Sequence, residues 1–436
     1  MGAEHDGIVP GGQPRVKVAL KGCAASICCA RRSAPRLGGP QAKEEARVKS
    51  AEVLVIGAGP AGIASAYFLG RAGIPYLVVD RAPVIASTWA SVYPALRLNT
   101  TRFYSHLPGC RFPWWFGIFP RGRQYHRYLE RFVHAHRLNI RLGVTVYRAC
   151  PEGDGWRVES SAGSAWYPAL IVATGRFGRP YQPPIPGQQT FTGELLHACA
   201  YRGPEPFRGR RVIVVGNGPS GVDIATDLGA HAARPVLLSQ RTGVVLRPRY
   251  PWGLPKHAWM MIAERLPAPL GRALLARIDR LKFEHLDRLG IKVPRTEAES
   301  TAAGATRGAE LIQAVRGGRV RCVDAPARFE GPDVVLSNGV RVRVDVVILA
   351  TGYQPALFSF LDLGEVPTNR DGWPLRVDEP PDDVSAGARE VLGWPGLYLV
   401  GTYYLGKGAL YNCNVEAAAA VTEIQQRLRR MGRWPA

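Results

Sequence analysis

Two glycine-rich loops carry the clearest chemistry in this sequence of 436 residues. The first reads Gly57-Ala58-Gly59-Pro60-Ala61-Gly62 and the second reads Gly216-Asn217-Gly218-Pro219-Ser220-Gly221, so both have the spacing GxGxxG. In such a loop the first glycine permits a tight turn, the second lets the backbone approach a pyrophosphate, and the third lets a helix pack on a strand. The N–H groups at the start of that helix then face the phosphates. The spacing predicts two dinucleotide-binding sites in one chain.

The residues that follow each loop predict different nucleotides. Asp80 lies 23 residues after Gly57, where its carboxylate can accept hydrogen bonds from ribose hydroxyls, and Arg81 follows it. The second unit ends instead on Ser239-Gln240-Arg241-Thr242, without an acid. A carboxylate there would repel a 2′-phosphate, whereas Arg241 can pair with one, so we expect the second site to bind NADP. The alternative is that Arg241 is one more surface arginine.

The elements that must position these loops form two similar units. Strand-like apolar runs at 53–56 and 76–79 flank a helical pattern at 60–70, and the same order recurs at 211–215, 219–228 and 236–238. Each set predicts a βαβ unit. A basic helical stretch at 259–289, broken at Pro267 and Pro269, and a helix at about 415–430 come later. The pattern predicts an α/β fold with two Rossmann-like dinucleotide-binding domains.

Two Thr-Gly turns predict how the chain passes between these domains. Val172-Ala173-Thr174-Gly175 and Leu349-Ala350-Thr351-Gly352-Tyr353 each follow an apolar strand. Such turns connect the flavin and nicotinamide domains of flavoproteins that hold two dinucleotides. We therefore predict an FAD-binding domain at 51–185 and 350–436, interrupted by an NADPH-binding domain at 186–349. In this arrangement NADPH reduces a flavin held by the first loop.

One segment between the loops makes the resemblance to a known family specific. Phe191, Gly193, His197 and Tyr201 have the spacing FxGxxxHxxx(Y/F), which resembles the identifying sequence of the flavin-containing monooxygenases, the class B flavoproteins. The order of motifs is similar to that family from about residue 51 to the C-terminus. In this interpretation His197 organises the linker between the domains and is neither an acid nor a base.

The resemblance implies cofactors, further site residues and a reaction. It implies that Thr88 and Trp89 contact FAD, and that Asn99, followed by Thr100, is the active-site asparagine near the flavin and the retained NADP. It also implies that reduced FAD forms a C4a-hydroperoxide that oxygenates a nitrogen or sulfur atom of a small organic substrate, with no metal. The alternative is Baeyer–Villiger attack on a ketone. The ending Tyr201-Arg202-Gly203 favours heteroatom oxygenation, because it is similar to the N/S-oxygenating and YUCCA-like pattern.

Other classes remain as alternatives. A flavoprotein disulfide reductase needs a cysteine pair beside the flavin, and the CxxxxC pair, Cys23 and Cys28, precedes the first loop. A non-catalytic flavin-binding protein is the second alternative. The aromatic run 112–116 could line a substrate channel, although such runs are more often packing.

The unusual charge has an ordinary interpretation. The chain has 56 Lys and Arg against 35 Asp and Glu, a formal net charge of +21. The arginines are scattered instead of gathered into one patch, so we expect no nucleic-acid partner. No apolar run is long enough to span a bilayer, and we expect a cytoplasmic enzyme acting on a small molecule and dioxygen, with a homodimer possible. Residues 1–50 are expected to be a disordered basic leader.

Overall fold

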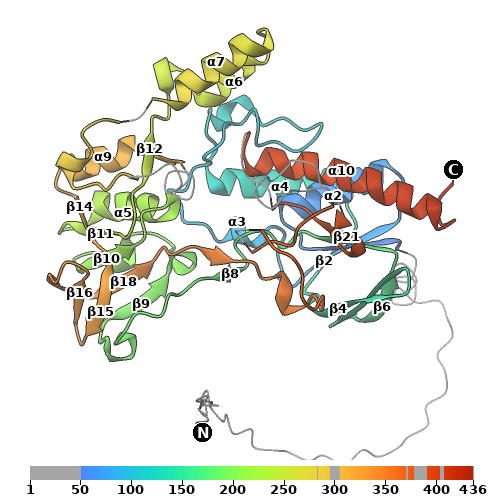
Figure 1. Ribbon diagram of the computed structural model, residues 1–436, viewed down its shortest axis with the longest axis horizontal. Helices are drawn as coiled ribbons and strands as arrows, with labels where there is room; N and C mark the ends of the chain where they lie inside the picture. Colours follow the sequence, from blue (N-terminus) through green and yellow to red (C-terminus); the bar gives the residue numbers. More distant parts are fainter. Residues whose placement is uncertain are drawn as a thin grey trace, which may run out of the picture. The chain divides into compact units, whose positions relative to one another are not determined.

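The computed structural model has the α/β architecture expected from the sequence (Figure 1). It describes residues 51–281, 283–294, 305–369, 372–377, 390–402 and 407–435. The expected leader at 1–50 lies outside these residues. Among the helices that are described, none combines the length and apolar character needed to cross a membrane.

The first lobe is built on a six-stranded sheet with the strand order β20-β21-β7-β1-β2-β3. All neighbouring strands are parallel except β20 and β21. Its strands come from residues that precede the second lobe in the sequence and from residues that follow it. This confirms that one domain is inserted into the other. The strands are β1 (Val53–Ile56), β2 (Tyr76–Asp80), β3 (Ile140–Leu142), β7 (Ala169–Val172), β20 (Glu390–Val391) and β21 (Trp394–Leu399).

Helices of the first lobe pack on this sheet as their sequences predict. Helix α2 (Pro60–Arg71) begins with a proline, whose missing N–H has no partner at a helix start in any case. Helix α10 (Ala409–Arg430) packs against α2 through small and apolar side chains (Figure 1). It ends on arginines, which complement the negative end of the helix dipole. Helices α3 (Ser87–Ala90) and α4 (Gly122–His136) and the 3₁₀ turn η1 (Trp114–Phe116) complete this side.

The second lobe repeats the plan with a five-stranded, wholly parallel sheet in the order β14-β11-β10-β18-β9. Every residue of the central strands β10 and β18 is buried, as expected when helices and loops cover both faces. The strands are β9 (Glu194–His197), β10 (Val212–Val215), β11 (Val236–Gln240), β14 (Val320–Asp324) and β18 (Val346–Leu349), and the helices are α5 (Pro219–His231), α6 (Lys256–Ala263), α7 (Ala268–Asp279) and α9 (Ala309–Arg316).

Short strands complete each lobe and join the two. The first lobe adds the antiparallel strands β4 (Val146–Glu152), β5 (Gly155–Ser160) and β6 (Gly163–Tyr167), and the second adds β15 (Pro326–Glu330), β16 (Asp333–Leu336) and β17 (Arg341–Arg343). A parallel pair is formed by β12 (Val245–Arg247) and β13 (Ala305–Arg307). The connecting pair is β8 (Arg179–Pro180) and β19 (Tyr353–Gln354), which run antiparallel. Each follows a Thr-Gly turn, so the chain passes between the lobes where the sequence predicts. The boundaries 51–185, 186–349 and 350–436 remain our proposal.

Three expectations differ in detail from the structure. Helix α10 begins at Ala409 instead of about 415, because Gly408 provides the turn that starts it. The predicted helical stretch 259–289 is two helices and a short turn, and Pro269 lies in the first turn of α7 instead of breaking it. Within the aromatic run, Phe112 is buried as packing predicts, whereas Trp114 and Trp115 are 76% and 63% exposed, so packing is the wrong prediction for that pair.

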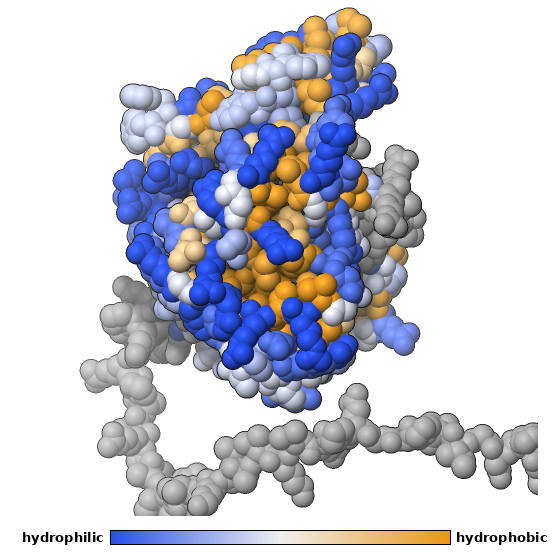
Figure 2. Space-filling model, turned by 90° about the vertical axis from the view of Figure 1, so that its left-hand side faces the viewer, coloured by the Kyte–Doolittle hydropathy of each residue, from blue (hydrophilic) through white to orange (hydrophobic). Residues whose placement is uncertain are grey.

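Figure 2 shows the surface on the side of the second lobe. Apolar side chains gather in the middle of this face, and hydrophilic ones surround them.

Candidate active site

Both loops make the tight turns that their glycines predict. Gly57 has φ +112°, and a Cβ atom there would lie 2.5 Å from the carbonyl oxygen of Ala173. Gly216 has φ +114° and the same distance to Ala350 is 2.4 Å. Backbone in this region of φ favours glycine. Each loop therefore packs directly on a Thr-Gly turn, and this contact brings the predicted motifs of each lobe together.

The last glycine of each loop is required for packing within the loop. A Cβ atom at Gly62 would lie 1.8 Å from the carbonyl oxygen of Gly57, and one at Gly221 would lie 1.8 Å from that of Gly216. No side chain fits at such a distance. The third glycine therefore lets the helix start against the turn, as the motif predicts.

The middle glycines behave differently, and this difference tests whether a dinucleotide fits. Gly59 has φ −81° and Gly218 has φ −69°, which any residue can adopt. A Cβ atom at either position would meet no heavy atom within 4 Å. Neither backbone strain nor protein packing explains a glycine here, whereas close approach of a pyrophosphate to the backbone does. The loops therefore fit dinucleotides.

Asp80 reaches the first loop as predicted. Its carboxylate accepts hydrogen bonds from the N–H groups of Ala58, at 2.7 Å, and Ala82, at 2.8 Å. These two bonds fix the carboxylate beside the loop at the end of β2, and each oxygen keeps acceptor capacity for a ribose hydroxyl. Arg81, next to it, is exposed.

Of the other residues predicted near the flavin, Thr88 and Trp89 lie on a segment that contacts the first loop. Helix α3 carries Thr88 and Trp89, and the N–H of Ala86 just before it donates to the carbonyl oxygen of Ala58 at 3.0 Å. Asn99 is exposed, and Thr100 bonds to the hydroxyl of Ser105 at 2.6 Å. A Cβ atom at Gly408 would lie 2.3 Å from Cγ2 of Thr100, so the start of α10 packs on the Asn99 segment.

Two buried hydroxyls next to the loops lack protein partners. Within the described part of the chain, the hydroxyls of Thr174 and Ser239 make no hydrogen bond. A buried polar group without a partner costs free energy unless a ligand or water satisfies it. Thr174 belongs to the turn that packs on the first loop, and the carbonyl of Ser239 accepts the N–H of Gly216 at 3.1 Å. A dinucleotide bound at each loop would supply a partner for the hydroxyl beside it.

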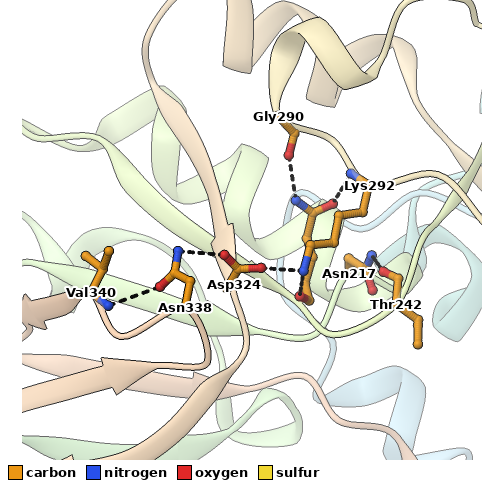
Figure 3. Close-up of polar contacts among 8 residues, drawn as sticks. Asn217, Thr242, Gly290, Lys292, Asp324, Asn338 and Val340 are labelled. Atoms are coloured by element: carbon orange, nitrogen blue, oxygen red, sulfur yellow. Dashed lines mark hydrogen bonds and ion pairs between the residues drawn. The ribbon is translucent and has the colours of Figure 1, made fainter.

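Figure 3 shows the polar contacts at the end of β11 in the second lobe. The side-chain amide of Asn217 donates to the carbonyl oxygen of Thr242 at 2.8 Å, which ties the loop to the segment after the strand. Arg241 and Thr242 are exposed there. The side chain of Gln240, between Ser239 and Arg241, is buried and bonds to the backbone of Gly290 and Lys292. Gln240 thus positions a neighbouring segment.

That segment adds Lys292, a cation that sequence reasoning missed. The ammonium of Lys292 donates to the carbonyl oxygen of Gln240 at 3.2 Å and also to Asp324, whose second carboxylate oxygen accepts from Asn338 at 2.7 Å (Figure 3). Lys292 therefore lies beside the residue that precedes Arg241. The only sequence signal is that lysine is rare in this chain.

Three of the predicted linker residues, Phe191, Gly193 and His197, have defined contacts. A Cβ atom at Gly193 would lie 2.5 Å from the ring of Phe191, so glycine is needed where this ring folds back. His197 is buried; its Nδ1 accepts the N–H of Cys199 at 3.2 Å, so its Nε2–H donates to the carbonyl oxygen of Gly352 at 3.1 Å. Burial lowers the pKa of His197, which keeps the ring neutral. His197 thus holds the second Thr-Gly turn, consistent with an organising role.

Comparison with known proteins agrees with this geometry. A family model described as "Pyridine nucleotide-disulphide oxidoreductase" matches residues 54–249. The flavin-containing monooxygenase of Stenotrophomonas maltophilia aligns with a TM-score of 0.62 at 22% identity, over 87% of this chain and 98% of that one. A structure of OTEMO in complex with FAD and NADP aligns with a TM-score of 0.61 at 17% identity, over 88% of this chain and 87% of that one. The fold and the two loops together define a flavoprotein with two dinucleotide sites.

A closer sequence relationship gives the family. The chain is 32% identical to the probable indole-3-pyruvate monooxygenase YUCCA1 of Arabidopsis thaliana over 331 residues, which are 74% of this chain and 80% of that protein. The chain therefore belongs to the flavin-containing monooxygenase family. It is a flavin-dependent monooxygenase whose cofactors are FAD and NADPH, and it acts on a small molecule and dioxygen.

Proposed function

We propose that this enzyme oxygenates an aromatic 2-oxo acid at its carbonyl carbon. The observation that supports this proposal is the 32% identity to a protein named for indole-3-pyruvate. In such a reaction the 2-oxo acid, dioxygen, NADPH and a proton would give the shortened carboxylic acid, carbon dioxide, water and NADP⁺. One oxygen atom of dioxygen enters the new carboxylate, the bond between the carbonyl and carboxylate carbons breaks, and the other oxygen atom leaves as water.

The residues of this chain would divide the work between the two cofactors. Bound FAD supplies the redox chemistry, since it accepts hydride from NADPH and activates dioxygen when reduced. We propose that the first loop and Asp80 hold the pyrophosphate and ribose of FAD, with Arg81, Thr88, Trp89, Asn99 and Thr100 along the same cofactor. The second loop, Ser239, Arg241 and Thr242 would hold NADPH, together with Lys292. Their main task is to orient the two rings and exclude water.

Analysis of the products tests the proposed substrate class. We expect indole-3-pyruvate to stimulate NADPH-dependent oxygen uptake and to yield the acid with one carbon fewer, carrying one atom of ¹⁸O from ¹⁸O₂. Phenylpyruvate provides a second aromatic 2-oxo acid, and pyruvate provides one without a ring. Oxygen uptake that none of the three stimulates would exclude the proposal while leaving the flavin chemistry intact.

Oxygenation of nitrogen or sulfur is the second candidate. It is supported by the linker ending Tyr201-Arg202-Gly203, which is similar to both the N/S-oxygenating and the YUCCA-like pattern. N,N-dimethylaniline and an alkyl aryl sulfide are suitable probes. A product that gains one oxygen atom without losing carbon would favour this candidate over the first.

Replacement of Asn99 by alanine tests the proposed catalytic residue. The side chain is exposed on a segment that packs against the start of α10, so its loss should disturb few contacts. We expect Asn99→Ala to keep oxidising NADPH while the share of oxygen released as hydrogen peroxide rises several-fold, because a group that shields the reacting flavin is lost. Parallel assays of NADPH, peroxide and product measure this share. A share equal to that of the wild type would remove Asn99 from the active site.

A further inference from the structure

We propose that Tyr93 and Asp223 are positioning residues that tie the Asn99 segment of the first lobe to the NADP-binding helix of the second. The inference rests on the proposed site. Tyr93 lies six residues before Asn99, and its hydroxyl donates to Oδ2 of Asp223 at 3.2 Å. Asp223 stands on α5, whose first residue, Pro219, belongs to the second loop.

Tyr93 is anchored in the second lobe although its backbone belongs to the first. Its side chain is 8% exposed and lies in the hydrophobic cluster that contains Tyr201, Val222 and Leu238. The rings of Tyr93 and Tyr201 meet edge to face with centroids 5.5 Å apart, a favourable aromatic geometry. The contact is therefore part of a packed core and not a chance surface encounter.

Helix α5 presents two carboxylates to this pair of tyrosines. The hydroxyl of Tyr201 donates to Asp227 at 2.7 Å, and Asp227 lies four residues after Asp223, on the same face of the helix. Burial raises the pKa of the Tyr93 hydroxyl, and the neighbouring carboxylates raise it further. The hydroxyl therefore remains a donor throughout the neutral range of pH.

The segment from Tyr93 to Thr100 is held from both sides. In the first lobe the N–H of Leu98 donates to Pro120 at 2.9 Å, and the carbonyl oxygen of Leu96 accepts from Gly122 at 2.9 Å. On the other side the segment is fixed through Tyr93. A nucleotide that orders the start of α5 thus restricts Tyr93 and, through it, the position of Asn99. We expect NADP⁺ bound at the second loop to rigidify this segment of the first lobe.

Hydrogen exchange on the FAD-loaded full-length enzyme tests whether NADP⁺ orders the segment through Tyr93. Saturating NADP⁺ should slow exchange in peptides covering 93–104 as well as in those covering 216–221. The slowing is measured as the ratio of the exchange rates without and with NADP⁺. In Tyr93→Phe we expect this ratio to fall about tenfold at 93–104, since a hydrogen bond to a charged group is lost, and to remain the same at 216–221. The share of oxygen released as peroxide should rise in parallel.

Tyr398→Phe provides the matched control. Tyr398 is also buried and its hydroxyl donates to Glu390 at 2.9 Å, but both residues lie in the first lobe. This variant should keep the slowing at 93–104. If Tyr93→Phe fails to fold, Asp223→Asn, which retains an acceptor without the charge, should show the same loss to a smaller degree.

The outcomes separate this inference from the proposed site. Slowing at 93–104 that is undiminished in folded Tyr93→Phe or Asp223→Asn, or that is absent in the wild type, overturns the positioning role. A wild type without slowing at 216–221 overturns the NADP site itself.

Discussion

Replacement of Gly59 by valine is expected to leave a folded protein that purifies without flavin. The φ and ψ angles of Gly59, −81° and −174°, lie in the extended region that valine favours. A Cβ atom there meets no protein atom within 4 Å, so the free energy of unfolding should hardly change. In the proposed site the same Cβ atom would occupy the space through which the pyrophosphate approaches the loop. We expect the ratio of flavin to protein, measured from the visible spectrum, to fall more than about tenfold, which corresponds to about 1.4 kcal/mol.

Two further glycine variants serve as controls for this result. Gly218→Val makes the equivalent change in the second loop, and should retain flavin while losing reduction by NADPH. Gly62→Ala places a Cβ atom 1.8 Å from the carbonyl oxygen of Gly57, and should lower the melting temperature even without cofactor. A yellow Gly59→Val protein with normal flavin content would show that the first loop does not hold FAD.

Loss of the Arg241 side chain is expected to abolish most of the preference for NADPH over NADH. The side chain is exposed after β11, where the 2′-phosphate of a bound nucleotide would lie. A hydrogen bond to a charged group contributes about 1.5–3 kcal/mol, so Arg241→Ala should raise the KM for NADPH by about tenfold or more. The KM for NADH, which has no such phosphate, should stay the same. Steady-state kinetics with both nucleotides measure the change.

Arg234→Ala is the matched control, because Arg234 is also exposed but precedes β11 at the opposite end of the strand. It should leave both KM values unchanged. Lys292→Ala should also raise the KM for NADPH, since the ammonium of Lys292 donates to the carbonyl oxygen of Gln240, next to Arg241. An unaltered preference in Arg241→Ala would mean that another group recognises the phosphate.

The parts of the fold and site that sequence predicts well are those set by short-range geometry. The contact of Asp80 with Ala58 follows from one βαβ unit, and the glycines of both loops follow from the turn that they must make. The passage of the chain at Thr174 and Thr351 is similarly local, because each turn directly follows a buried strand.

The parts that sequence does not predict depend on packing between distant segments. Lys292 reaches the end of β11 from a position 52 residues after Gln240, and the same contact holds the side chain of Gln240. The bond between Tyr93 and Asp223 joins residues 130 positions apart. The exposure of Trp114 and Trp115 likewise depends on which neighbours cover them, and an aromatic run alone gives no signal of this.

The interleaving of the two sheets also has a consequence for biosynthesis. Strand β7 pairs with β21, whose residues Trp394–Leu399 are synthesised only after the whole second lobe. The second lobe needs strands from a single continuous stretch, between β9 and β18. On the ribosome, the later lobe can therefore complete its sheet while the earlier one still lacks an edge, which reverses the usual order in which N-terminal domains fold first.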